Sequence, residues 1–361
     1  MHALVFHGRE LDYAVDTIKS TFVSSVGAYV GRFERDVESY TVSPKAVATV
    51  NGKSALHIAL KLAAVESGDL VIIQPLKFVA TSNAIAYCNA EPVFVDVDRD
   101  TLGLSSNALQ AWLGENVFVD DDGKCRTNSE KRIIKACVPM HTFGHPVDLE
   151  ALLNLTRDWG IRFVEDAAES LGSFYKGKHT GTFGKVGVLS FNGNNIITTG
   201  GGMILTDEST GAIAKHLTTT TKQPRTYEYV HDEVGYNYRL PNLNAALGCA
   251  PSEQLELFIE SKRKLLEHYQ VELKGTDLQF VTEPNDCFSN YWLNAVICED
   301  LNHRDALLDT TNRQGVMTCP IWALMNQLPM YRACICADLS NSEWLEARVV
   351  NLPSSVASSV S

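Results

Sequence analysis

The sequence predicts an α/β fold, with a large domain built on a mostly parallel sheet sandwiched by helices and a smaller C-terminal α+β domain. Short β-rich runs alternate with amphipathic helical patterns from residue 46 to about 206, which is typical of parallel sheets covered by helices. The 361 residues are 45% hydrophobic and 20% charged, enough apolar material for a large core in about two domains. We expect the domains to cover 1–250 and 251–361.

Each strand expected in the large domain is short, apolar and flanked by Gly, Pro or polar residues, as turns between strands and helices require. These strands cover 46–50, 70–73, 93–97, 133–138, 162–165, 186–191 and 203–205. Helical patterns at 54–65 and 81–88 follow the first two strands. In such a sheet, ligands bind beyond the carboxyl ends of the strands, so we expect the functional site there.

The C-terminal part begins with a long helical pattern from Pro241 to about Leu273, and Pro251 inside it should kink the helix or split it in two. Shorter runs follow. They predict strands over 291–296 and 315–317 and helices over 301–313 and 342–350. We expect this smaller domain to share a wide interface with the first.

Charge and cysteine usage restrict the class of protein. Lys plus Arg number 31 against 43 Asp plus Glu, a formal net charge of -12, which disfavours nucleic acid and anionic membranes as partners. The nine Cys show no paired framework, as expected for reduced thiols. The sequence also has no signal-peptide pattern and no apolar run of about 18 residues. We therefore expect a soluble cytoplasmic protein with small-molecule partners.

The first motif is Val50-Asn51-Gly52-Lys53-Ser54, where a strand runs through Gly into a helix. A P-loop would require Gly at position 47, where this chain has Val47. The turn remains suited to an anion at a helix N-terminus, although a plain strand-to-helix turn would look the same. A nicotinamide-type glycine fingerprint follows none of the strands, which argues against a dehydrogenase.

A second motif is Asp166, which closes the strand IRFVED. A carboxylate at the buried end of a strand needs a cationic partner, and a protonated heterocyclic nitrogen, as in pyridoxal phosphate (PLP), would serve. The alternative is an Asp that caps the next helix. The segment 190–202, rich in Gly and Asn, suits a loop that approaches a ligand closely.

Metal binding is not predicted. His141 and His145 lie close together, but no further ligands follow at usable spacing. Cys334 and Cys336 likewise lack a second pair.

Taken together, the motifs resemble the DegT/StrS nucleotide-sugar aminotransferases, which are PLP-dependent transferases of fold type I. The resemblance covers nearly the whole chain. It rests most clearly on VATVNGKSALHIAL (47–60), VPMHTFGHP (138–146), the segment 164–187, SFNGNNIITTGGGMILTD (190–207) and the segment 231–249. The likeness is greatest to enzymes that aminate C4 of a UDP-linked 4-keto-6-deoxy-N-acetylhexosamine on the way to bacillosamine or legionaminic acid.

The resemblance implies a cofactor, partners and site residues. PLP, or its amine form PMP, would be the cofactor, glutamate the amino donor, and a homodimer with a shared active site the working form. Asp166 would pair with the pyridinium nitrogen, Phe78 would stack on the ring, and Glu169 would lie beside its phenolic oxygen.

The phosphate cradle would be Gly52, Lys53, Ser54 and Ser190, with Asn237 from the second subunit. The substrate side would be His141, Asn194, Tyr238 and Arg239.

One departure from the family pattern concerns catalysis directly. Asn195 stands where the family has the lysine that forms a Schiff base with PLP, and an amide is neither a nucleophile nor a proton carrier. Lys53, Lys77 and Cys319 also depart from the usual residues. Two interpretations remain open: an aminotransferase that is slow at best, or an inactive member that binds PLP, PMP or the nucleotide sugar non-covalently. In a variant of these, Lys53 or Lys77 supplies a substitute amine.

Overall fold

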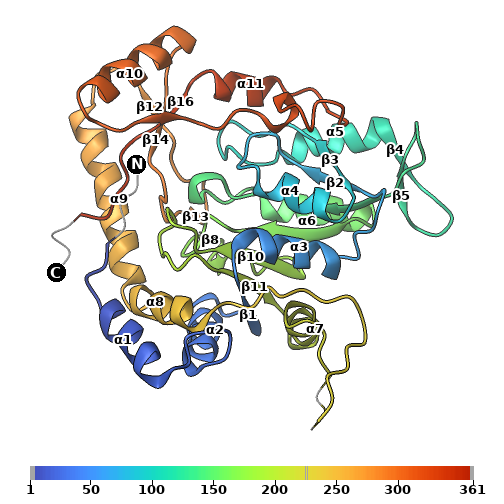
Figure 1. Cartoon of the computed structure of the whole chain (residues 1–361). Helices are drawn as coiled ribbons and strands as arrows, with labels where there is room; N and C mark the ends of the chain where they lie inside the picture. Colours follow the sequence, from blue (N-terminus) through green and yellow to red (C-terminus); the bar gives the residue numbers. More distant parts are fainter. Residues whose placement is uncertain (1–4, 224, 226, 358–361) are drawn as a thin grey trace.

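The computed structural model describes residues 5–223, 225 and 227–357. Its centre is a seven-stranded sheet with the order β1-β11-β10-β7-β6-β2-β3 (Figure 1). The strands are β1 (Lys45–Thr49), β2 (Leu70–Ile73), β3 (Glu91–Phe94), β6 (Ile134–Cys137), β7 (Arg162–Asp166), β10 (Val186–Ser190) and β11 (Gly202–Thr206). Neighbouring strands from β10 to β3 are parallel, whereas β11 is antiparallel to both β1 and β10. The mostly parallel sheet is therefore confirmed.

Helices cover both faces of this sheet, because alternate strand residues point to opposite sides. Val71 and Ile73 of β2 pack in one core cluster with α3, α4 and α7, whereas Leu70 and Ile72 pack in another with α5 and α6. The helices are α3 (Gly52–Leu62), α4 (Ala80–Tyr87), α5 (Ser106–Asn116), α6 (Leu149–Asp158) and α7 (Glu208–Thr218). Of these five helices, the sequence patterns predicted only α3 and α4.

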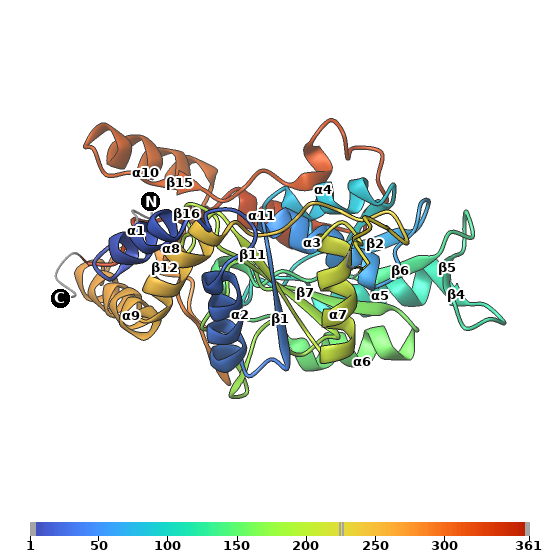
Figure 2. The same cartoon turned by 60° about the horizontal axis from the view of Figure 1, so that its bottom comes forward.

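At the β1 edge, α2 (Ala28–Thr41) and α7 lie on either side of the sheet (Figure 2). α1 (Glu10–Ser20) and α2 pack against α8 (Asn242–Ser252). The long helix expected from Pro241 is split, since Pro251 lies in the last turns of α8 and α9 (Leu255–Glu272) begins three residues after α8 ends. Within the described residues, every helix is too short or too polar to cross a lipid bilayer.

The C-terminal region forms an antiparallel sheet of order β12-β14-β16-β15. Its elements are β12 (Gln279–Phe280), β14 (Ala295–Ile297), α10 (Leu301–Arg313), β15 (Cys319–Pro320), η2 (Met325–Gln327), α11 (Ser340–Glu346) and β16 (Val349–Asn351). A small sheet of β8 (Phe174–Tyr175), β9 (Lys178–His179) and β13 (Cys287–Phe288) joins this region to the large one. The rest are β4 (Val117–Val119), β5 (Cys125–Thr127) and η1 (Thr142–Gly144).

Two expected C-terminal elements are wrong, and the strand expected over 291–296 forms only from Ala295, as β14. The strand expected at 315–317 is a turn, because Gly315 has φ +80 and ends the segment after α10, and the strand comes later as β15. The helix expected over 342–350 ends at Glu346, and Val349 and Val350 pair instead with β14 as part of β16. Short apolar runs of β-branched residues fit the periodicity of a helix or of a strand. Pairing with β14 makes Val349 and Val350 a strand.

Candidate functional site

A cavity of about 520 Å³ opens at the carboxyl ends of the strands, where the sheet order predicts a ligand site. It is bounded by the end of β7, the segment after β10, the start of α3 and two tryptophans of the C-terminal region. Its lining residues are Asn51, Gly52, Lys53, Leu56, Phe78, Ala80, Thr81, Met140, Asp166, Ala168, Glu169, Ser190, Asn192, Gly193, Asn194, Asn195, Trp292 and Trp322.

The first turn of α3 forms one wall. The side chain of Asn51 caps the helix, its Oδ1 accepting a hydrogen bond from the backbone N–H of Ser54 at 2.8 Å. A Cβ atom on Gly52 would lie 2.8 Å from Cβ and Oγ of Ser190, so only glycine allows this close approach. The positive end of the helix dipole and the Lys53 side chain therefore border the cavity beside Ser190, an arrangement suited to an anion.

Asp166 lies at the end of β7 and is 2% exposed. Its Oδ2 accepts hydrogen bonds from Thr81 Oγ1 at 2.5 Å and from Lys77 Nζ at 3.2 Å, and its Oδ1 accepts one from the backbone N–H of Ala168 at 3.3 Å. Asp166 therefore already has a cationic partner within the chain, the fully buried Lys77, which the sequence did not lead us to expect. A turn and not a helix follows β7, so the alternative of a helix-capping Asp is wrong.

Burial shifts two titrating groups beside Asp166. Desolvation lowers the pKa of Lys77, although the Asp166 carboxylate opposes this shift. Desolvation also raises the pKa of Glu169 to about 8, against the hydrogen bond that its carboxylate accepts from the backbone N–H of Phe143 at 2.9 Å. Glu169 is therefore largely protonated at neutral pH and can donate a hydrogen bond into the cavity that it lines.

Asn195 also lines the cavity and is 6% exposed. Its Nδ2 donates hydrogen bonds to the carbonyl oxygens of Ser190 at 2.6 Å and Ala168 at 3.1 Å, so both amide hydrogens are used by the main chain. The preceding carbonyl, that of Asn194, accepts a hydrogen bond from Trp292 Nε1 at 2.6 Å. This bond ties the loop after β10 to the C-terminal region.

Most residues expected at the site line the cavity, but four assigned to substrate or to a second subunit do not. His141 is fully buried, with its Nε2 3.3 Å from Glu165 Oε1. Asn237 is exposed, and Tyr238 packs beside His57. The backbone of Arg239 forms an isolated antiparallel β-bridge with that of Thr49. Ser54, which was expected at the phosphate, is buried in the first turn of α3 and does not line the cavity either. Their proposed roles stay predictions.

Several cavity residues were not expected from the sequence, among them Thr81, Trp292 and Trp322. Thr81 lies four residues after Lys77, in the first turn of α4, and a Thr at the start of a helix gave no distinguishing signal. Trp292 and Trp322 come from a region about 100 residues or more away from the loop that they face. Isolated tryptophans carry no spacing pattern, so only the tertiary structure could reveal them.

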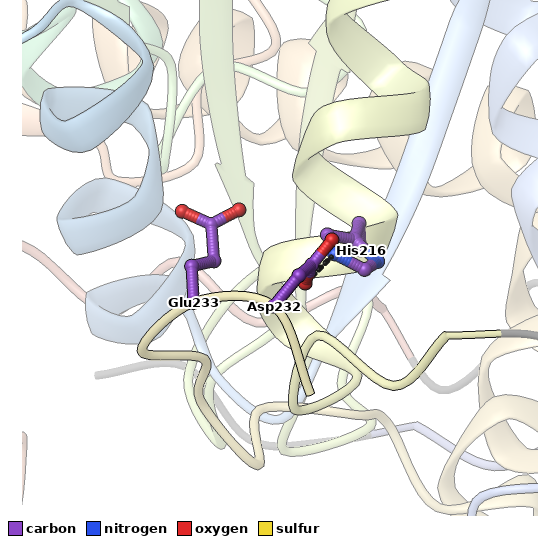
Figure 3. Close-up of side chains that lie close together, drawn as sticks. All are labelled: His216, Asp232 and Glu233. Atoms are coloured by element: carbon purple, nitrogen blue, oxygen red, sulfur yellow. Dashed lines mark hydrogen bonds and ion pairs between the residues drawn. The ribbon is translucent and has the colours of Figure 1, made fainter. Parts of the chain in front are cut away.

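A separate polar group lies on the surface near α7, where side-chain atoms of His216, Asp232 and Glu233 come within 4.8 Å of one another. His216 and Asp232 face each other, with Nε2 and Oδ1 2.7 Å apart, while Glu233 stands to one side (Figure 3). Asp232 also accepts a hydrogen bond from Gln223 at 2.8 Å. These bonds account for the grouping, and we assign no metal to it.

Comparisons with known proteins identify the family of this chain. Residues 6–359 match the DegT/DnrJ/EryC1/StrS aminotransferase family. The chain is 34% identical over 363 residues to GDP-perosamine synthase of Escherichia coli O157:H7 (96% of this chain, 90% of that protein), and 34% identical over 353 residues to that of Vibrio cholerae (96% and 91%). The crystal structure of the aminotransferase TlmJ from Streptoalloteichus hindustanus superposes with a TM-score of 0.85 at 26% identity (97% and 91%). This chain therefore belongs to the DegT/DnrJ/EryC1/StrS aminotransferase family.

Proposed function

We propose that this chain is a nucleotide-sugar aminotransferase that holds PLP or PMP in the cavity around Asp166 without a covalent bond to the protein. The family is PLP-dependent, and bound PLP supplies an electron sink for carbanion chemistry. The observation that carries the proposal is the single cavity at the carboxyl ends of the strands, which Asp166, Phe78 and the N-terminus of α3 line together.

The residues of the cavity fit such a cofactor. Gly52, Lys53 and Ser190 offer a phosphate site at the start of α3, where a Cβ on Gly52 would clash with Ser190. Phe78 is half exposed and lines the cavity, as a residue that stacks on a ring would. Glu169 is placed to donate a hydrogen bond to a phenolic oxygen, because its raised pKa keeps it protonated.

Asn195 limits the chemistry. We propose that it occupies the position of the Schiff-base lysine, and its amide is already hydrogen-bonded to two carbonyls. It can neither attack an aldehyde nor move a proton between the two reacting carbons. Positioned acid/base catalysis is commonly worth about 10²- to 10⁴-fold, so turnover should be slow. Lys77 is an unsuitable substitute, since it is fully buried and paired with Asp166.

For the substrate, we propose a nucleotide-linked 4-keto-6-deoxy sugar with glutamate as amino donor. The sequence resemblance favours a UDP-linked N-acetylhexosamine aminated at C4. A GDP-linked hexose is the second candidate, because the relatives that are 34% identical are named GDP-perosamine synthases. The nucleotide is therefore the part of the proposal that most needs a direct assay.

The test is an aminotransfer assay with both 4-keto sugar nucleotides, glutamate and PLP, read by mass spectrometry of the amino sugar nucleotide. Asn195→Lys is expected to raise the rate at least about tenfold, a low estimate of the acid/base contribution. Equal rates for the two proteins would contradict the role given to Asn195. A different outcome is that Asn195→Lys gives product while the natural chain binds the cofactor but gives none. This result would favour the second interpretation, a family member that binds without turnover.

The working form is proposed to be a homodimer in which the partner subunit completes each site. In the single chain, Asn237 and Tyr238 lie outside the cavity that they were expected to serve. α1 also exposes apolar side chains at Leu11 and Ile18, as an interface would. Light scattering should give twice the chain mass. A monomer that binds PLP as tightly as expected for the complete site would refute the shared site.

A further inference from the structure

The contact between Lys77 and Asp166 has a consequence for any pyridine ring bound in the cavity. Lys77 lies on the segment between β2 and α4, is fully buried, and does not line the cavity, whereas Asp166 does. Its Nζ is 3.2 Å from Asp166 Oδ2. The ammonium group therefore reaches the carboxylate from a position that does not border the cavity.

We infer that Lys77 is a resident cation that neutralises Asp166 and thereby disfavours a protonated nitrogen in a pyridine ring bound beside that carboxylate. The inference rests on the proposed function, because it concerns the ring of the cofactor. One carboxylate stabilises one positive charge well, and a second cation at the same group is repelled by the first. With Lys77 already paired, Asp166 offers a ring nitrogen little net attraction for a proton.

Among the residues that the structure describes around Lys77, we find no second anion to compensate. The groups that act on Lys77 are Asp166 on β7, Glu169 just after it and Cys137 on β6. Burial raises the pKa of both Glu169, to about 8, and Cys137, so both are mainly uncharged near neutrality. Thr81 on α4 donates to Asp166 Oδ2 without adding charge. Desolvation lowers the pKa of Lys77 itself, and the Asp166 carboxylate 3.2 Å away opposes that shift. The positive charge of Lys77 therefore depends on its pairing with Asp166.

An uncharged ring nitrogen is a weaker electron sink than a protonated one. The Lys77–Asp166 pair and the amide of Asn195 therefore have the same effect. Both reduce carbanion chemistry on the cofactor, and both leave the cavity able to hold it. Lys77 acts indirectly, because it changes the charge that Asp166 presents and does not contact the ring itself.

The test uses PLP labelled with ¹⁵N in the ring and bound to the full chain, with the ¹⁵N chemical shift followed against pH. Lys77→Met should raise the pH midpoint of ring protonation by about 1 to 3 units, the usual effect of one charge within a few ångströms. Lys61→Met, at the far end of α3 on the exposed surface, should leave the midpoint unchanged. Equal midpoints for the natural chain and Lys77→Met would overturn the inference.

Lys77→Met leaves a buried carboxylate unpaired and could fail to fold, so the double variant Lys77→Met/Asp166→Asn serves as a second comparison. It has neither charge, and its midpoint should match that of the natural chain. A natural midpoint higher than that of the double variant by more than about one unit would show that Asp166 still acts as a free anion, and would also overturn the inference. Absence of PLP binding in every variant and in the natural chain would instead refute the proposed function.

Discussion

The side-chain amide of Asn195 is held by the main chain of the strand that precedes it, with Nδ2 donating to the carbonyl oxygen of Ser190 at 2.6 Å. The same nitrogen donates to the carbonyl of Ala168 at 3.1 Å. Asn195 is thus fixed at the wall of the cavity as a structural residue, and its hydrogen-bond donors are directed to the protein and not to a ligand.

Asn195→Lys should restore a covalent link to PLP, because it places an amine at the cavity wall next to Asp166. We expect a borohydride-stable pyridoxyl group on residue 195, found by peptide mass spectrometry. The loss of the two amide hydrogen bonds should cost about 1 to 3 kcal/mol of stability. Asn194→Lys, one residue earlier, is the matched control and should give no such adduct. Labelling of both variants to the same extent would contradict a specific role for position 195.

Lys77→Met should destabilise the chain by about 3 to 5 kcal/mol, because it leaves the buried Asp166 carboxylate without its cation. The double variant Lys77→Met/Asp166→Asn should regain most of this loss. The exposed pair of Lys264 and Glu260, with side chains 69% and 59% exposed, is the control, and Lys264→Met should cost less than about 1 kcal/mol. Urea unfolding measures all three. Similar costs at the two lysines would show that the buried pair is not charged.

Glu169 should make stability fall as the pH rises from about 4.5 to about 8. Its pKa is raised to about 8 in the folded chain from the ordinary value of 4.5, so over this window the folded state binds more protons than the unfolded state and rising pH favours unfolding. Glu169→Gln keeps an acceptor for the Phe143 N–H but does not titrate. Unfolding free energies at several pH values should therefore show a smaller decline in the variant. Parallel curves for the two proteins would refute the raised pKa.

Trp292 and Trp322 should report ligand binding through their fluorescence, since both line the cavity. PLP is expected to quench the natural chain, and quenching should decrease in Trp322→Phe. Trp292→Phe should also lose about 1 kcal/mol of stability, because Asn194 loses its hydrogen-bond donor. Trp159→Phe is the control, because Trp159 caps the C-terminal end of α6 and is not among the residues that line the cavity. Equal quenching in all of these proteins would place the ligand elsewhere.

The strands of the large domain could be predicted from the sequence because buried parallel strands are short apolar runs bounded by turn residues. Asp166 could be placed at the ligand edge for the same reason, since it closes such a strand. The C-terminal elements were harder. Val349 and Val350 fit a helix or a strand, and their pairing with residues about 50 positions earlier was decided by tertiary structure.

The pairing of Lys77 with Asp166 could not be predicted from the sequence. The two residues are 89 positions apart, and their contact depends on the order of the strands: β2 and β7 both neighbour β6. Spacing rules describe contacts within one helix or hairpin, so they contain no information on this pair. For the same reason, the buried contact of His141 with Glu165 could not be predicted from the sequence.

The most direct test of the central claim is equilibrium dialysis of the natural chain with PLP, followed by borohydride reduction of the loaded protein. Non-covalent binding at the Asp166 cavity predicts saturable uptake of one PLP per chain, full release on dialysis, and no pyridoxyl group on any peptide after reduction. Uptake should also be lost in Gly52→Val, which fills the cradle beside Ser190. A reduced adduct on Lys53 or Lys77, or uptake that Gly52→Val leaves intact, would contradict it.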